Sequence, residues 1–198
     1  MNVAELLFAA CIGVGLAAAC GFRVFVPMFV LSLAANAGHV TLGPNFQWIG
    51  SDAAVVAFAL ATALEIGGYY IPWLDNLLDT IATPAAVTAG IIATASVTTQ
   101  QSPLLGWAVA LIAGGAVAAT VQTMTVSARA TSTATTAGLA NRVVAKTETL
   151  GAFILALIAV IAAPIAIGLV ILLAAYLFRR WSRPRLRLAQ QIHRANAA

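Results

Sequence analysis

The sequence is poor in charge and in the residue types that usually carry catalysis or bind metals. Only 8% of its 198 residues are charged, against roughly a quarter in typical soluble domains. It has two cysteines and two histidines, and it contains no CxxC, HExxH or GxSxG motif. These absences exclude the usual signatures of zinc, c-type haem and iron–sulfur sites, and of common hydrolases. The sequence therefore predicts no cofactor and no enzymatic activity, and it leaves open whether a metal binds.

What the chain does have is apolar residues, which make up 62% of the sequence with a mean hydropathy of +0.97. A protein of this size buries only part of its surface in one core, so this much apolar surface needs lipid to cover it. The composition predicts an all-α, polytopic transmembrane helix bundle. Residues 1–178 would form the transmembrane domain, followed by a basic tail over 179–198.

Six apolar segments are candidate membrane spans, and six is the preferred count. Five is the alternative, in which the first two segments form one long helix broken near Arg23 and kinked by Pro27. Six spans place both termini in the cytoplasm, whereas five place the amino terminus outside. The segments cover residues 3–20, 24–37, 53–71, 85–97, 104–125 and 150–178.

The tail over 179–198 holds six of the ten basic residues and no acid. Positive charge next to a span favours the cytoplasmic side, so we expect a bacterial inner membrane with the carboxyl terminus in the cytoplasm. The tail has little aromatic content and adjoins a span. It is therefore expected to contact anionic lipid headgroups rather than nucleic acid.

Two ionisable residues interrupt apolar segments, where charge is costly and often functional. Glu65 has no charged neighbour within nine residues on either side, and Arg23 lies between the first two segments. Glu65 is a candidate ion- or substrate-binding residue, or else a structural partner of Arg23 across the bundle. Arg23 is either a counter-charge in the site or a side chain that reaches from a helix end to the interface.

The stretch from Pro72 to Pro84 is the richest in polar signals. In a helix, Asp75, Asp79 and Thr83 would share one face at positions i, i+4 and i+8, with Asn76 beside it. Two carboxylates one turn apart repel each other, so a cation, a shared proton or an arginine is expected between them. The proline at each boundary favours a broken or re-entrant segment that lines a cavity. An interfacial helix with its acids in water is the alternative.

A second polar stretch runs from residue 127 to residue 149 and is rich in threonine and serine. Its Arg129 could bind an anion or supply the counter-charge for Asp75 and Asp79, or the stretch could be an exposed loop. With six spans, this stretch and the 72–84 segment lie on the same side of the membrane, so we expect that they could converge.

Three stretches of the chain resemble a known family of small bacterial membrane proteins, domain of unknown function 4126. The stretches are residues 21–27 (GFRVFVP), 65–84 (EIGGYYIPWLDNLLDTIATP) and 131–136 (TSTATT). The resemblance covers most of residues 5–175 and leaves the basic tail outside. It implies a polytopic membrane protein and carries no activity with it.

The leading functional hypothesis is a small transporter or channel linked to protons or cations. Acids on a broken helix beside glycines and prolines are typical of transporter binding sites. The alternative is a non-catalytic subunit of a larger membrane complex, with a homo-oligomer also possible. An intramembrane aspartyl enzyme is disfavoured, because Asp75 and Asp79 on one helix turn cannot face each other across a substrate.

Overall fold

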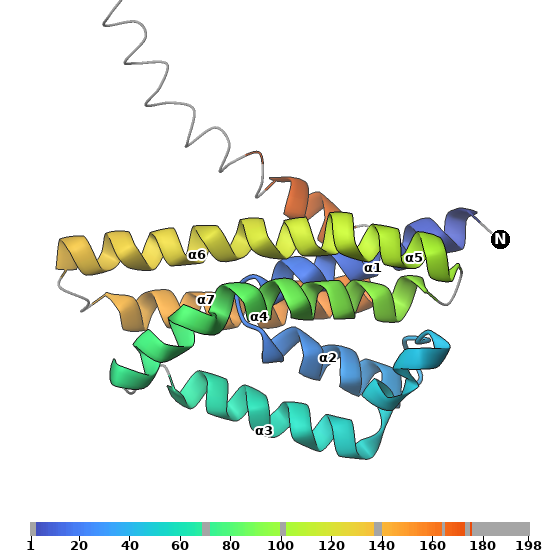
Figure 1. The fold of residues 1–198 in the computed structure, drawn as a ribbon, viewed down its shortest axis with the longest axis horizontal. Coiled ribbons are helices and arrows are strands. Elements are labelled where there is room, and N and C mark those ends of the chain that lie inside the picture. Colours follow the sequence, from blue (N-terminus) through green and yellow to red (C-terminus); the bar gives the residue numbers. More distant parts are fainter. Residues whose placement is uncertain are drawn as a thin grey trace, which may run out of the picture.

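The computed structural model describes residues 3–68, 72–99, 102–136, 140–163, 165–172 and 175, with the backbone alone for 72–80. Every element in these ranges is helical (Figure 1). The basic tail over 179–198 lies outside the described residues. The elements are α1 (Val3–Cys20), α2 (Phe25–Asn36), the 3-10 helix η1 (Pro44–Gly50), α3 (Asp52–Gly68), α4 (Pro72–Thr98), α5 (Pro103–Val109), the π-helix η2 (Ala110–Gly114), α6 (Gly115–Thr136) and α7 (Asn141–Ile161).

The helices run back and forth along one axis, so their connections gather at two ends (Figure 1). We call one the hairpin end; there α3 leads to α4 and α6 to α7, whereas the α1–α2 turn lies farther inside, about midway along the bundle (Figure 1). We call the other the amino-terminal end; it holds the start of α1, residues 37–51 and the connection from α4 to α5. The two polar stretches, around 72–84 and 127–149, both lie toward the hairpin end, as the six-segment pattern predicted.

Small residues let the central helices approach closely. Thr94 on α4 donates its hydroxyl to the carbonyl of Gly13 on α1 at 3.0 Å and to that of Gly90 at 2.8 Å. A Cβ on Gly90 would stand only 2.6 Å from the Cβ of Ala118 on α6. In lipid there is little hydrophobic gain from bringing helices together, so such close packing and hydrogen bonds hold them. This α1–α4–α6 seam is the centre of the bundle.

Among the described residues, four helices are long and apolar enough to cross a membrane, or up to five if η1 and α3, bent by 64°, count as one span. The predicted all-α, polytopic bundle is therefore confirmed. The 24–37 segment, a span in the preferred count of six, forms the 12-residue helix α2, about 18 Å long against a core of about 30 Å. The five-span alternative joined this segment to the first. Instead the chain turns at residues 21–24, and α2 runs back beside α1 (Figure 1).

Pro84 does not end a helix, contrary to the prediction of a short separate piece between Pro72 and Pro84. Helix α4 continues through Pro84 to Thr98. Proline lacks the N–H that would bond to the carbonyl four residues earlier, and its ring pushes that carbonyl away, so it bends a helix. In Figure 1 the first part of α4 accordingly runs at an angle to the remainder. The 72–84 segment is thus a bent extension of a span.

The predicted last span, 150–178, is interrupted at Ala162, where the backbone leaves the helical region at φ −142° and ψ 61°. The Cβ atoms of Ala159 and Ala166 lie 2.8 and 3.0 Å from where a Cβ on Gly15 would stand. They are thus within about 6 Å of each other, whereas seven residues of straight helix advance about 10.5 Å. The chain therefore bends sharply after α7 and stays against α1.

Candidate functional site

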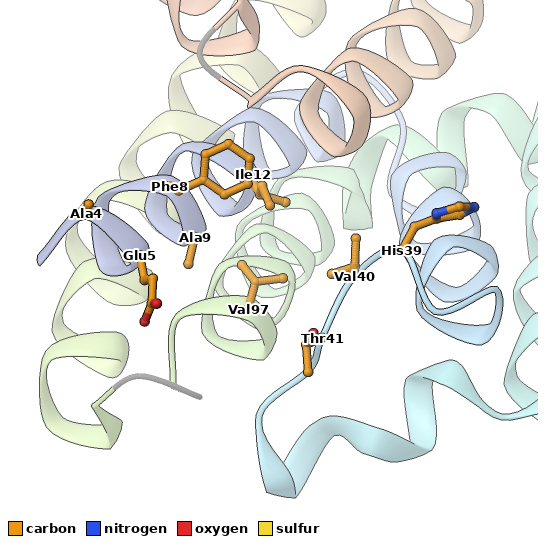
Figure 2. Close-up of a pocket in the computed structure, with 9 residues that line it drawn as sticks. All are labelled: Ala4, Glu5, Phe8, Ala9, Ile12, His39, Val40, Thr41 and Val97. Carbon is orange, nitrogen blue, oxygen red and sulfur yellow. The ribbon is translucent and has the colours of Figure 1, made fainter. Parts of the chain in front are cut away.

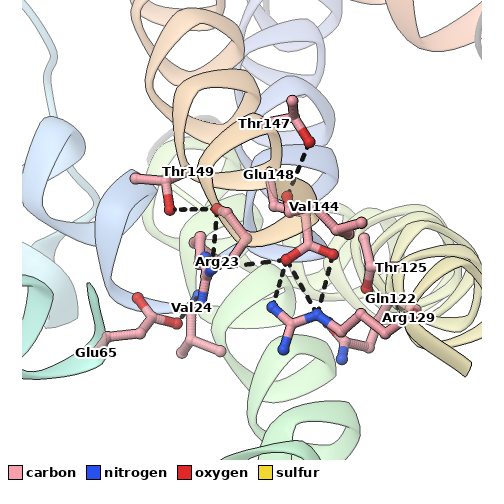
Figure 3. A network of polar contacts seen from close by, with 11 residues as sticks. Arg23, Val24, Glu65, Gln122, Thr125, Arg129, Val144, Thr147, Glu148 and Thr149 are labelled. Atoms are coloured by element: carbon pink, nitrogen blue, oxygen red, sulfur yellow. Dashed lines mark hydrogen bonds and ion pairs between the residues drawn. The ribbon is translucent and has the colours of Figure 1, made fainter. Parts of the chain in front are cut away.

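Four ionisable side chains are buried together at the hairpin end of the bundle (Figure 3). Arg23 comes from the α1–α2 turn, Glu65 from α3, Arg129 from α6 and Glu148 from α7. Their residues expose only 2–8% of their surface. Two arginines and two glutamates give this charge network a formal charge of zero. We define these four residues as the charge network.

Arg129 and Glu148 form the central ion pair. The Nε atom of Arg129 donates to both carboxylate oxygens of Glu148 at 3.2 Å, and its Nη2 contacts Oε2. Arg129 lies seven positions before Thr136, where α6 ends, and Glu148 lies seven positions after Asn141, where α7 begins. Because α6 and α7 are antiparallel neighbours (Figure 1), equal spacing from the turn brings the two residues to the same level.

Arg23 approaches the same carboxylate from the α1–α2 turn. Its Nη2 lies 3.6 Å from Oε2 of Glu148 and donates to the carbonyl of Ala145 at 3.0 Å. The turn is held tightly against α6, since a Cβ on Gly21 would stand 2.5 Å from the Cβ of Val121. Glu148 therefore joins two guanidinium groups that come from different parts of the chain.

Glu65 satisfies the amino terminus of α2. Its Oε1 accepts the backbone N–H of Val24 at 2.8 Å, and its Oε2 accepts that of Phe25 at 3.0 Å. The first N–H groups of a helix have no partner within the helix, and a negative charge there is favourable. Val24, at the N-cap position, makes no capping bond of its own. A carboxylate from α3 thus replaces the missing cap and ties α3 to α2.

Each buried charge in the network needs a partner of opposite charge to be stable. Charged groups removed from water cost several kcal/mol each, and only close pairing with good hydrogen bonds offsets this. Removing one partner of such a buried pair typically costs about 3–5 kcal/mol because it leaves a buried charge unmatched. The network therefore links α3, α6, α7 and the α1–α2 turn into a unit that responds to any change in charge.

Three of the residues predicted as site residues, Glu65, Arg23 and Arg129, meet in this network. The structure gives Glu65 contacts with the backbone of α2, and it places Arg23 and Arg129 on Glu148. Whether either arginine also balances the acids of the 72–84 segment stays a prediction.

The other predicted site residues lie on the first part of α4. The backbone of Asp75, Asn76 and Asp79 is helical, which is the condition for their sharing one face, but their side chains lie outside the described residues. Thr83 is exposed. An ion- or substrate-binding role for these four residues also stays a prediction.

Sequence reasoning missed Glu148. One signal could have found it, because Glu148 is the only acid after Asp79 and stands two residues before the last apolar segment. An isolated acid at the start of a span beside a stretch with two arginines is a candidate for an ion pair.

Two of the cavities formed by the described residues lie at opposite ends of the bundle. The larger, about 400 Å³, is at the amino-terminal end between α1, residues 39–41 and the end of α4, and includes Glu5, Phe8 and His39 (Figure 2). The smaller, about 220 Å³, is at the hairpin end beside Arg23 and α7. Among the described residues, no group of three or more His, Cys, Asp or Glu side chains is placed to hold a metal ion.

The comparison with family models gives one match, described as Domain of unknown function (DUF4126), over residues 10–183. The match includes all four residues of the charge network and the whole 72–84 segment. No curated protein and no solved structure matches the chain.

Proposed function

This chain belongs to the DUF4126 family, and since that description assigns no activity, we propose from the site itself that it is a small proton- or cation-linked membrane transporter. One observation carries the proposal. Glu148 is buried and shared by two arginines that come from separate segments of the chain. Ionisable residues within membrane proteins are costly and commonly mark transport pathways.

The arrangement can work as a charge switch. A proton on Glu148, or a cation drawn to it, weakens its hold on Arg23 and Arg129 at the same time. Arg23 belongs to the α1–α2 turn, and the far side of that turn is held by Glu65 through the amino terminus of α2. Loss of the Arg23–Glu148 contact would therefore loosen the α1–α2 turn against α7, while the close packing of α1 against α4 and α6 stays in place.

The two cavities support the proposal because they open the bundle from opposite ends. The larger lies at the amino-terminal end, the smaller at the hairpin end, and the tightly packed α1–α4–α6 seam lies between them. A solute that reaches a shared site from each side in turn needs this kind of arrangement. In this proposal Asp75 and Asp79 attract the cation at the hairpin end.

The test is flux in proteoliposomes under an imposed proton or cation gradient. We expect flux in the wild type and its loss in Glu148→Gln, in Glu65→Gln and in the double variant Asp75→Asn/Asp79→Asn. Asp52→Asn is the matched control, because Asp52 is an exposed acid at the opposite end. Absence of flux under every gradient in folded wild type, or full flux in folded Glu148→Gln, would contradict the proposal.

An accessory subunit of a larger membrane complex is the second candidate. It is favoured by the zero formal charge of the network and by the donors that each glutamate already has, which are the features of a structural lock. Extraction in mild detergent separates the two functions. Fixed partners that co-purify at constant ratio indicate the subunit, whereas a monomer or homo-oligomer with measurable flux indicates the transporter.

We also propose that the hairpin end faces the cytoplasm of a bacterial inner membrane, which places the amino terminus outside and so differs from the six-span expectation of two cytoplasmic termini. Arg142 and Lys146 are exposed there, whereas the described part of the amino-terminal end carries Glu5 and Asp52 and no lysine or arginine. The positive-inside rule favours the basic end in the cytoplasm. A cytoplasmic basic tail agrees with this orientation only if the chain returns to the hairpin end after α7. Such a return requires a bend in the chain, and the backbone bends at Ala162.

Labelling with a membrane-impermeant thiol reagent in intact cells tests this orientation. Both native cysteines are first replaced by serine, and single cysteines are then placed at Ser51 and at Arg142. We expect labelling at position 51 in intact cells and at position 142 only after the cells are opened. The reverse pattern would refute the orientation.

A further inference from the structure

We propose that the smaller cavity, at the hairpin end, binds the headgroup and upper chain of an anionic phospholipid. This inference is independent of transport. The cavity lies between the end of α3 and the first half of α7. Its lining residues are Arg23, Ile66, Arg142, Ala145, Lys146, Thr149, Leu150 and Phe153.

The lining changes from cationic to apolar along a single face of α7. Arg142 and Lys146 are one turn apart and both exposed, and Leu150 and Phe153 continue the same face by one and two further turns. Ile66, on α3, also lines the cavity and adds an apolar side chain. An anionic headgroup followed by a hydrocarbon chain has the same order of chemistry.

The charge of the lining selects an anion. Three of the eight lining residues are basic and none is acidic, and the hydroxyl of Thr149 adds a polar group beside them. Arg142 and Lys146 are exposed, so they can move to meet a phosphate, whereas Arg23 is held at the back of the cavity by Ala145 and Glu148. Clusters of basic residues next to spans bind anionic lipid headgroups in this way.

The apolar half of the lining favours a lipid over a free anion. Leu150 is 61% exposed, and Phe153 is half-buried beside it. Inorganic phosphate has nothing to place against these side chains, whereas an acyl chain covers both of them. The cavity is also at the right depth. Helix α1 starts at the amino-terminal end and is about 27 Å long, so Arg23, three residues beyond it, lies near the opposite membrane boundary.

Native mass spectrometry of the full chain with added phosphatidylglycerol or phosphatidylcholine tests the proposal. We expect bound phosphatidylglycerol on the wild type, and binding weaker by about 25-fold in Arg142→Gln/Lys146→Gln, since each of the two surface charges contributes roughly a factor of five. The matched control is Arg187→Gln/Arg194→Gln, which removes the same charge from the basic tail. We expect this control variant to bind phosphatidylglycerol as tightly as the wild type does.

Two further arms identify the source of the phosphate. Leu150→Asn is expected to weaken phosphatidylglycerol binding even though Arg142 and Lys146 are unchanged in this variant. Millimolar inorganic phosphate is expected not to displace the lipid. Equal binding of phosphatidylcholine, displacement by phosphate, or equal loss in the tail control and the Arg142/Lys146 variant would each overturn the proposal. Circular dichroism of each variant checks that its helical content is kept.

Discussion

The charge network makes one prediction that follows directly from counting its charges. The wild-type network has a formal charge of zero, so Glu148→Gln leaves it at +1 and Arg129→Gln leaves it at −1. The double variant returns it to zero. The double variant should therefore cost less free energy of unfolding than the sum of the two single effects, because it removes two side chains but restores the charge balance.

The magnitudes come from the contacts of Glu148. Glu148→Gln leaves two buried guanidinium groups, on Arg23 and Arg129, without the carboxylate that both approach. We expect it to lower the free energy of unfolding by about 3–5 kcal/mol. Arg129→Gln should cost less, about 2–3 kcal/mol, because Arg23 still lies 3.6 Å from the carboxylate. The double variant should be more stable than Glu148→Gln alone, which requires a coupling at least as large as the cost of Arg129→Gln, about 3 kcal/mol.

The assay is reversible unfolding of the purified protein in mixed micelles, with SDS as the denaturant and helical content as the signal. All four members of the cycle are measured under one set of conditions. Single effects that simply add in the double variant would refute the reasoning, since they would mean that Arg129 and Glu148 do not interact. Equal costs for the two single variants would refute the role assigned to Arg23.

Three further predictions concern the packing and capping of the helices. Gly90→Ala should destabilise by about 1–3 kcal/mol because its Cβ would stand 2.6 Å from that of Ala118, whereas Gly67→Ala, with nothing within 4 Å, should be neutral or slightly stabilising in the same unfolding assay. Thr94→Val should cost about 1 kcal/mol by removing the hydroxyl that bonds α4 to α1, and Thr94→Ser should retain that bond, as hydrogen exchange in this region would report. Glu65→Gln should cost about 1–2 kcal/mol and speed amide exchange in the first turn of α2, since a neutral amide is a weaker acceptor for its N–H groups; unchanged exchange would contradict the capping role.

Part of the site could be predicted from sequence and part could not. Glu65, Arg23 and Arg129 stood out because a charge beside apolar residues has a cost that local sequence reveals. Glu148 did not, because it lies within the polar stretch over 127–149, where an acid looks ordinary. Its partner Arg23 lies 125 positions earlier in the chain, and no local pattern indicates which arginine will reach which glutamate.

The sequence by itself determined the class of this protein. Its 62% apolar content and its apolar segments require a helical bundle in lipid. This much apolar surface is unstable in water, and backbone N–H and C=O groups without partners are unstable in lipid, where a helix pairs them. Apolar content and the length of apolar segments are properties of the local sequence, so they can be determined without knowing the fold. The order of the segments was enough to place the two polar stretches at the same end.

The tertiary structure alone decided how that bundle is joined. It turned the chain back at residues 21–24, carried α4 through Pro84, bent the chain at Ala162 and brought Glu148 between two arginines. A proline or a glycine permits several backbone paths of similar local energy, and packing against neighbouring helices selects one of them. A buried charge likewise accepts any partner of opposite sign, and only the approach of α6, α7 and the α1–α2 turn determines which partner it meets.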